Sequence, residues 1–376
     1  MTPNVYLTSP VFFEIADHKK VSEKYANRIR KLQEELSKVG DLHVAGSRFP
    51  SGDEIAQFVK ENEIDLVGCH LSHPITEETM NTPSLKGVST STAGFNHICL
   101  KEDVVTTHTP GVLDDTVADY TIAIILANLR NIIDLHSFLW NGNWTPDKKW
   151  DLDQELNNVI DNKKVGIVGL GEIGLEVAKR LLPWGLDIVY YDINRNKEME
   201  EKYDNLSFQG DLEELFSQSD VVTLHVPLNK HKKGMVDETL LKKMKDDALL
   251  VNTARGPIVN FDDLIRLLEN QKIAIDLSFD VWDPEPVSQE VLKKFKKIKR
   301  EQPERRFVFM PHNASSDADT RAKMSIMILE DLISMASSKK AEDLKDLRFI
   351  PSQRKFSELD EDTRKELEQF RIAQWW

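Results

Sequence analysis

Short apolar runs alternate with segments of helical periodicity over most of the chain. Four runs in the first hundred residues are typical of buried strands: 5–8, 42–45, 65–69 and 87–91. Between them, residues 19–39 and 53–61 carry apolar side chains at helical spacing. Strands and helices in alternation favour a parallel sheet covered by helices. Residues 1 to about 104 are therefore predicted to form a small α/β unit.

A long amphipathic segment, 114–140, follows the loop at Pro110 and Gly111 and predicts one helix. A second and longer alternation starts at Lys164. Its predicted strands lie near 164–169, 187–191, 220–225, 248–252, 274–280 and 307–310. A helix is then expected at 317–336, and the charged tail shows helical spacing at 361–370.

Two alternations of this kind predict an α/β protein with two domains, Rossmann-like and flavodoxin-like. Each domain is expected to hold a parallel sheet, with a cleft between the two domains. The first is expected to comprise 1–104 and 311–338, the second 105–310, and 339–376 to form a C-terminal extension. The extension ends in Trp375 and Trp376. Two indoles are unfavourable in water, so they are expected to dock on the body or on a partner subunit.

The charge balance restricts the partners to expect. The chain has 49 basic and 63 acidic residues, a net charge of −14, which argues against nucleic acid and anionic membranes as partners. A basic stretch at 287–306 lacks interleaved aromatic residues and is interpreted as a solvated helix face. An anionic substrate would need a local cation in so acidic a protein, and Arg255 is a candidate.

Cysteine usage and hydropathy favour a cytoplasmic protein. Cys69 and Cys99 are the two cysteines of the chain, and neither lies in a CxxC or another metal-ligand spacing. We therefore expect reduced thiols and no bound metal. The first residues lack the basic start and long apolar run of a signal peptide. The longest apolar stretch, 121–129, is too short to span a bilayer, so no membrane partner is expected.

A glycine-rich turn follows the first strand of the second alternation. Gly169, Gly171 and Gly174 form a GxGxxG pattern between an apolar strand and a helix predicted at 175–182. In this context the first glycine makes a tight turn and the second lets the backbone approach a pyrophosphate. The third lets helix and strand pack closely. The pattern predicts a dinucleotide site.

The residues around this turn indicate which dinucleotide. The backbone N–H groups at Glu172 and Ile173 begin the helix and favour phosphate. Asp192 ends the next strand, where a carboxylate binds the adenosine ribose and repels a 2′-phosphate. NAD is therefore predicted over NADP. Arg195 lies nearby and is the residue that would weaken this exclusion.

Three residues in turn-rich segments follow later strands and are candidates for a catalytic site. They are Arg255, Glu285 and His312. Each alone is compatible with an ordinary surface or structural role. Together they lie at the carboxyl ends of successive strands, where ligands bind in such folds. Arg255 can bind a carboxylate or polarise a keto oxygen. His312 can deliver a proton near neutral pH, and Glu285 can orient its ring and favour its charged form.

These phrases resemble the D-isomer-specific 2-hydroxyacid dehydrogenase family, which has Arg, Glu and His in this order. The similarity extends from about residue 60 to 338, and the chain is most similar to the glyoxylate and hydroxypyruvate reductases of the family. Besides the glycine-rich turn and the three catalytic phrases, the motifs that carry it are TAGFNHI at 92–98, TPGVL at 109–113, TVAD at 116–119 and HVPL at 225–228. The tail after residue 338 has no recognised counterpart.

The resemblance implies an enzyme that interconverts a small 2-keto acid and a D-2-hydroxy acid with NAD. It implies that 105–310 binds NAD and that the first domain binds substrate. Backbone amides at Ala93 and Gly94 would hold the substrate carboxylate, together with Arg255, and the region of Ser72 would select the substrate. The nicotinamide side would be lined by Val226, Pro227, Thr253, Asp280 and Thr116. A homodimer formed through the nucleotide domain is also implied.

Other functions stay open at this point. The same scaffold serves other D-2-hydroxy acids, such as D-lactate or 3-phosphoglycerate. The C-terminal-binding corepressors keep the same three residues in a non-enzymatic NAD(H)-sensing scaffold. A formate dehydrogenase is disfavoured because its histidine is normally coupled to a glutamine, whereas this chain has Glu285.

Overall fold

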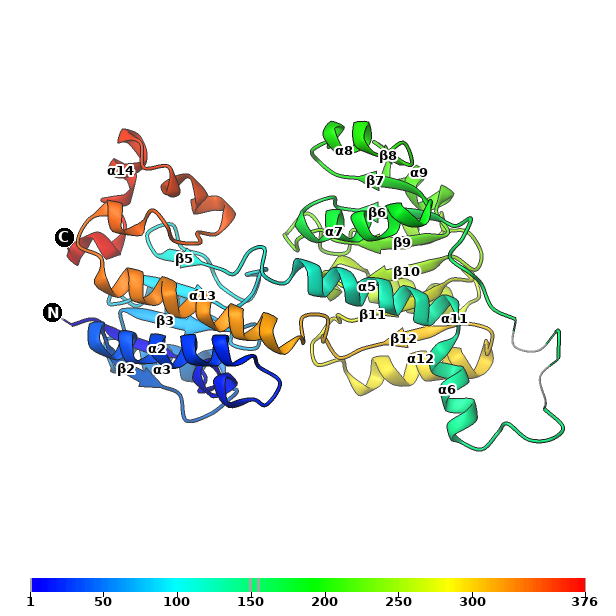
Figure 1. Ribbon diagram of the computed structural model, residues 1–376, viewed down its shortest axis with the longest axis horizontal. Helices are drawn as coiled ribbons and strands as arrows, with labels where there is room; N and C mark the ends of the chain where they lie inside the picture. The colour runs from blue at the N-terminus through cyan, green and yellow to red at the C-terminus, as the bar shows by residue number, and fades with distance from the viewer. Residues whose placement is uncertain (1, 149–150, 154–155, 376) are drawn as a thin grey trace. The chain divides into compact units, whose positions relative to one another are not determined.

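The computed structural model describes residues 2–148, 151–153 and 156–375. The chain divides into two compact units, Met1–Leu113 with Ser316–Trp376, and Asp114–Ser315 (Figure 1). These limits differ from the expected domain limits at 104 and 311. The strand after residue 104 pairs with the first sheet, and the tail packs on the first unit.

The first unit is built on a five-stranded parallel sheet in the order β2-β1-β3-β4-β5. Its strands are β1 Asn4–Leu7, β2 Asp41–Val44, β3 Leu66–Cys69, β4 Gly87–Thr90 and β5 Val105–Thr107. Its helices are α1 Val11–Glu14, α2 Glu23–Val39, α3 Gly52–Glu61, α4 Glu77–Asn81, α13 Ala318–Ser337 and α14 Glu361–Leu367. Helices α2 and α13 lie side by side in one apolar core, and α3 packs in another core with β3 and β4.

The second unit contains a seven-stranded parallel sheet in the order β12-β11-β10-β9-β6-β7-β8. Its strands are β6 Lys164–Val168, β7 Asp187–Tyr191, β8 Leu206–Phe208, β9 Val221–Leu224, β10 Leu249–Asn252, β11 Asp276–Phe279 and β12 Phe307–Phe309. Strands β9, β10 and β11 are buried along their whole length, as expected for the centre of a sheet covered on both faces. The predicted fold class, two parallel-sheet α/β domains, is confirmed.

Helices surround this second sheet. They are α5 Asp114–Leu129, α6 Ile132–Trp140, α7 Glu172–Leu181, α8 Lys197–Lys202, α9 Leu212–Gln218, α10 Glu238–Leu241, α11 Phe261–Glu269 and α12 Gln289–Glu301. The basic stretch forms α12 and buries Phe295 and Ile298. The single helix predicted at 114–140 is wrong. Asn131 adopts a left-handed conformation with φ of 49°, which asparagine tolerates better than most residues, and the chain bends there by 63°.

Among the described residues no single helix is long and apolar enough to cross a membrane, and the one pair that passes together, α5 and α6, is bent.

The tail beyond residue 338 is part of the first unit. It forms short 3₁₀ segments at Ala341–Leu344, Pro351–Ser357 and Arg371–Trp375, with α14 between the last two. Trp375 packs against the core of α2 and α13, and the Lys86 ammonium lies 5.0 Å from its ring centre. The expectation that this tryptophan docks on the body is met, whereas Trp376 lies outside the described residues.

Candidate active site

The glycine-rich turn connects β6 to α7 with the geometry that a dinucleotide requires. Gly169 has a φ of +96°, and a Cβ there would lie 2.8 Å from the His225 carbonyl oxygen. A Cβ on Gly174 would lie 2.0 Å from the Gly169 oxygen, so α7 packs on the turn only without a side chain. A Cβ on Gly171 would meet nothing within 4 Å. Among the described residues no contact explains Gly171, whereas a pyrophosphate at the start of α7 would.

Asp192, which directly follows β7, hydrogen-bonds the glycine-rich turn. Its carboxylate accepts hydrogen bonds from the Leu170 amide at 2.7 Å and from the Asn194 amide at 2.9 Å. Asp192 is half-buried at the end of β7, as expected for a ribose-binding acid. Arg195 is engaged elsewhere, since its guanidinium donates to Glu200 at 2.6 Å. The backbone and carboxylate present here fit NAD or NADP as a bound group.

A buried asparagine shapes the turn that carries Arg255. The Asn252 side chain donates to the Arg255 carbonyl at 2.9 Å and accepts from the Ala254 amide at 3.1 Å. Arg255 is half-buried and donates to the Ala254 oxygen at 2.7 Å. Burial lowers the pKa of its guanidinium, and the neighbouring Glu285 carboxylate opposes that change. The turn therefore holds a cation partly out of water beside an acid.

Gly256 joins the arginine turn to the glutamate turn. A Cβ on Gly256 would lie 1.9 Å from the Trp282 backbone oxygen, so the two turns touch through their main chains. We expect Gly256→Ala to lower the free energy of unfolding by at least about 2 kcal/mol, the usual scale of forced overpacking. Gly210→Ala is the control, because its nearest neighbour would be 3.6 Å away. Denaturant unfolding of both variants tests this contact, and equal midpoints would contradict it.

Glu285 and His312 form a directly bonded pair. His312 Nδ1 lies 2.6 Å from Glu285 Oε2, and the two side chains are 25% and 32% exposed. Glu285 Oε1 also accepts from the Trp282 amide at 2.8 Å. Burial raises the pKa of Glu285, but the bonds from His312 and Trp282 and the charge of Arg255 outweigh it, so this pKa lies below its ordinary value. An ionised Glu285 fixes the ring through Nδ1, and Nε2 remains to exchange a proton.

The loop of His312 is held by Asp280, which follows β11. The Asp280 carboxylate accepts from the Asn313 amide at 2.7 Å and the Ala314 amide at 2.8 Å. The Tyr120 hydroxyl bonds the same carboxylate; burial and this acid raise the pKa of Tyr120 to about 12. His312 itself has a φ of 52°, a conformation that needs such support. Asp280 is fully buried and holds the His312 loop through its two oxygens.

The other cofactor residues expected in this unit follow strands of the second sheet or begin α5. Thr253 is buried and its hydroxyl lies 2.9 Å from that of Thr121 on α5. Val226 is buried close to Gly169, while Pro227 beside it is exposed. Thr116 is half-buried in the first turn of α5. Among the residues described, no group of histidine, cysteine, aspartate and glutamate is arranged to hold a metal ion.

The substrate residues expected in the first unit lie on two loops after strands. Ser72 is exposed after β3, and its amide donates to His70 Nδ1 at 3.3 Å. Ala93 and Gly94 follow β4, and the Ala93 carbonyl accepts from His108 Nδ1 at 2.8 Å. In the described part of this unit neither amide has a hydrogen-bond partner. Two adjacent N–H groups are thus available for an anion.

Sequence reasoning missed the residues that support the site. Asn252 and Trp282 were part of the recognised phrases, but nothing in one sequence shows that they shape the turns. The Trp282 indole donates to the Met310 oxygen at 2.8 Å and so ties the glutamate turn to the segment before His312. Tyr120, in contrast, is an ordinary position of the largely apolar helix α5, and no signal identifies it.

Comparison with known proteins gives one family. Residues 122–314 match the model of the D-isomer specific 2-hydroxyacid dehydrogenase, NAD binding domain. A glyoxylate reductase of Thermofilum pendens is 36% identical over 292 residues, covering 76% of this chain and 82% of that protein. A glyoxylate reductase of Thermococcus litoralis is 34% identical, covering 74% of this chain and 82% of that protein.

Solved structures share the fold. A glyoxylate reductase from Paecilomyes thermophila superimposes with a TM-score of 0.74 at 24% identity, over 94% of this chain and 100% of that chain. The TT0316 protein from Thermus thermophilus gives a TM-score of 0.70 at 27% identity, over 88% of this chain and 96% of that chain.

Proposed function

Because the chain belongs to the D-isomer-specific 2-hydroxyacid dehydrogenase family, we propose that it reduces a small 2-keto acid such as glyoxylate or hydroxypyruvate to the D-2-hydroxy acid with NADH. Membership makes it an NAD(P)-dependent oxidoreductase of 2-hydroxy acids. The relatives named above are glyoxylate reductases, which supports the substrate. The observation that carries the proposal is the 2.6 Å Glu285–His312 pair beside Arg255.

His312 is assigned as the acid and base of the reaction. NADH, when bound, supplies the hydride that adds to the keto carbon. The charge that develops on the keto oxygen is met by a proton from His312 Nε2, and the reverse reaction returns it. Ionised Glu285 stabilises the protonated ring through Nδ1, so it favours the proton-donating form. Because Glu285 also bonds the Trp282 amide, its carboxylate holds that ring in one orientation.

Arg255 is assigned to the substrate carboxylate and the keto oxygen. A guanidinium stays charged and can bind both groups with its planar set of donors. The amides of Ala93 and Gly94 are assigned to the same carboxylate, and Ser72 to the region that selects the substrate. Partial burial of Arg255 supports this role, since a half-buried cation attracts an anion more strongly than one in water.

The cofactor residues divide between two functions. Gly169, Gly171 and Gly174 shape the pyrophosphate turn, and the amides of Glu172 and Ile173 begin the helix that faces it. The nicotinamide side is assigned to Val226, Pro227, Thr253, Asp280 and Thr116. NAD is proposed over NADP because Asp192 directly follows β7 and because Glu200 engages Arg195, the nearby cation that would otherwise attract a 2′-phosphate.

Removing the charge of Asp192 should relax this preference. Asparagine keeps an oxygen for the Leu170 amide, so Asp192→Asn should leave the turn in place. We expect the ratio of kcat/KM for NADPH to that for NADH to rise at least about tenfold, since a like-charge contact costs more than 1.4 kcal/mol. Asp187→Asn, which removes a charge at the other end of β7, is the control. An unchanged ratio would remove Asp192 from cofactor selection.

We also propose a homodimer formed through the second unit, in the cytoplasm. Eight large apolar side chains, on α6 and in the segment between α6 and β6, are at least two-fifths exposed, more than a monomer ordinarily leaves in water in one segment. They are Ile132, Ile133, Leu139, Trp140, Trp144, Leu152, Leu156 and Val159. Sedimentation should give a dimer, and Trp140→Glu should weaken it. A monomeric parent chain would contradict the proposal.

The free thiols of Cys69 and Cys99 support a reducing compartment.

The function is tested by a panel of 2-keto acids with NADH and NADPH, followed at 340 nm. The panel contains glyoxylate, hydroxypyruvate, pyruvate and 3-phosphohydroxypyruvate. The highest kcat/KM is expected for glyoxylate or hydroxypyruvate with NADH. A clear preference for pyruvate or the phosphorylated acid would keep the reaction and overturn the substrate.

A further inference from the structure

We propose that the C-terminal segment, residues 339–375, positions the loop at Ala93 and Gly94 and thereby sets the affinity for the substrate carboxylate. It acts through His108. This inference rests on the proposed function, because that function assigns the carboxylate to these two amides. One chain of hydrogen bonds inside the first unit connects the tail to β5 and the end of β5 to the loop at Ala93 and Gly94.

The tail covers the outer edge of β5, the last strand of the first sheet. Phe349 forms an antiparallel bridge with Thr107, and the Ile350 amide donates to the Thr106 oxygen at 3.1 Å. The buried Gln353 side chain accepts from the Thr106 amide at 2.9 Å and donates to the Val104 oxygen at 3.0 Å. An edge strand with open N–H and C=O groups would otherwise face water or another chain. The tail thus completes the sheet.

The same edge carries His108 directly after β5. Its amide donates to the Arg348 carbonyl of the tail at 3.0 Å. Its ring donates from Nδ1 to the Ala93 carbonyl at 2.8 Å, and the next amide, of Thr109, donates to the Thr92 oxygen at 3.0 Å. The ring also packs edge-on against Phe95. His108 therefore contacts the tail through its backbone amide and the loop at Ala93 and Gly94 through its ring.

Arg348, whose carbonyl accepts the His108 amide, also anchors the tail to α13. The Arg348 guanidinium donates to Asp331 and to Glu330 on α13, each at 2.8 Å, and Asp331 is buried. Such a pair is costly to break because one charge would be left buried. The Arg348 carbonyl, which receives the His108 amide, is fixed by this pair.

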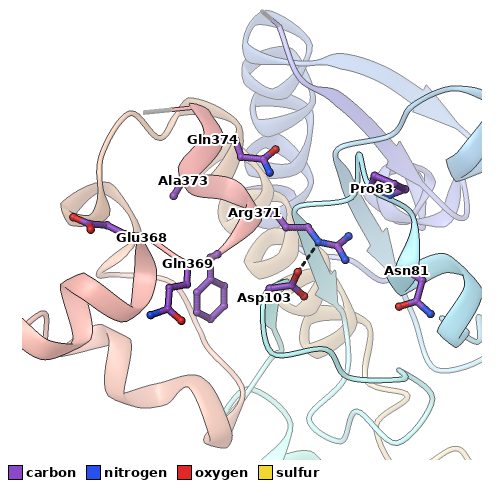
Figure 2. A pocket seen from close by; sticks show the side chains of 9 residues that line it. Asn81, Pro83, Asp103, Glu368, Gln369, Arg371, Ala373 and Gln374 are labelled. Atoms are coloured by element: carbon purple, nitrogen blue, oxygen red, sulfur yellow. Dashed lines mark hydrogen bonds and ion pairs between the residues drawn. The ribbon is translucent and has the colours of Figure 1, made fainter.

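The far end of the tail is clamped to the same unit (Figure 2). The Arg371 side chain donates to Asp103 at 2.8 Å and to the Thr82 oxygen at 2.6 Å, and its amide donates to the Asp103 oxygen at 3.0 Å. Eight large apolar residues of the tail are buried: Leu344, Leu347, Phe349, Ile350, Phe356, Leu367, Phe370 and Ile372. Burial of these apolar side chains stabilises the first unit. Truncation would therefore unfold the unit, and point variants are needed.

The first test removes the donor of His108. In His108→Leu the Ala93 carbonyl loses its partner, whereas in His108→Asn the amide can donate from the position of Nδ1. We expect KM for the keto acid to rise about tenfold in His108→Leu, with kcat and KM for NADH changed less than about twofold. Binding of the carboxylate is shared by ground and transition states, so KM changes more than kcat. His108→Asn should recover most of the loss.

The second test acts from the tail. Gln353→Leu removes the side-chain bonds to the Thr106 amide and the Val104 oxygen. Thr363→Val removes the hydroxyl bonds to Asp360 at the start of α14, which do not involve β5. KM for the keto acid should rise severalfold in Gln353→Leu and stay unchanged in Thr363→Val. Hydrogen exchange at the amides of 92–95 should speed up in Gln353→Leu and in His108→Leu.

The outcomes separate the two proposals. If the parent chain reduces no 2-keto acid, the proposed function fails, and the exchange experiment still reports the coupling. If the parent chain is active while KM and exchange stay unchanged in His108→Leu and Gln353→Leu, the positioning role fails. A KM that rises equally in His108→Asn and His108→Leu would also overturn it.

Discussion

Substitution of His312 by asparagine is expected to lower kcat by about 10²–10⁴-fold, the usual contribution of a positioned acid or base. Asparagine suits the control of structure, because it tolerates the left-handed φ of 52° at this position. Its amide can still donate to Glu285 in place of Nδ1. It cannot supply a proton, so the loss isolates proton transfer from loop geometry. KM for the keto acid should change little.

Steady-state rates at saturating NADH and keto acid measure this effect. Glu285→Gln should cause a smaller loss, since glutamine keeps a bond to the ring but not the charge that favours its protonated form. His43→Asn, at a half-buried histidine of the first unit, is the control and should leave kcat unchanged. An active His312→Asn enzyme would show that another group transfers the proton.

Substitution of Arg255 by lysine is expected to lower kcat/KM by about 10²-fold or more, mainly through KM. Lysine keeps the charge but loses the planar pair of donors that binds a carboxylate and the adjacent keto oxygen together. Arg255→Gln should be worse, because Glu285 then loses the neighbouring cation that lowers its pKa. The affinity for NADH, measured by protein fluorescence, should change little in both variants.

Arg266→Lys is the matched control, since Arg266 is 48% exposed on α11 and pairs with surface acids. Its kcat/KM should equal that of the parent chain. If Arg255→Lys retains full kcat/KM, the substrate carboxylate is held by other groups and the assignment of Arg255 is wrong.

Much of the fold could be predicted because the spacing of apolar residues in each segment agrees with the side chains that the structure buries. The buried strands around Gly169, and the glycine turn itself, follow from apolar runs and from positions where no Cβ fits. Strands β5 and β8 were not predicted. Each has three residues, too few for a period, and β5 is polar at Thr106 and Thr107 yet fully buried because the tail covers it. The bend at Asn131 depends on a single backbone conformation that periodicity does not report.

In the site, too, the sequence predicts the reacting residues but not the residues that support them. Arg255, Glu285 and His312 were identified by residue type and by their place after strands, and the bond between the last two is present at 2.6 Å. Their supports, Asn252 and Tyr120, act through bonds to residues far away or to the local backbone, which one sequence does not display. The tail, predicted as a C-terminal extension, packs in the core of the first unit. Outside 361–370 its buried apolar residues lie in short 3₁₀ segments and loops, where no helical or strand period marks them.

The most direct test of the central claim is to identify the product of the parent chain. Hydroxypyruvate with NADH should give glycerate at a rate equal to NADH consumption, and chiral chromatography should show only the D enantiomer. Loss of both signals in His312→Asn would tie the reaction to this site. L-glycerate, or no glycerate from parent chain that binds NADH, would contradict the account.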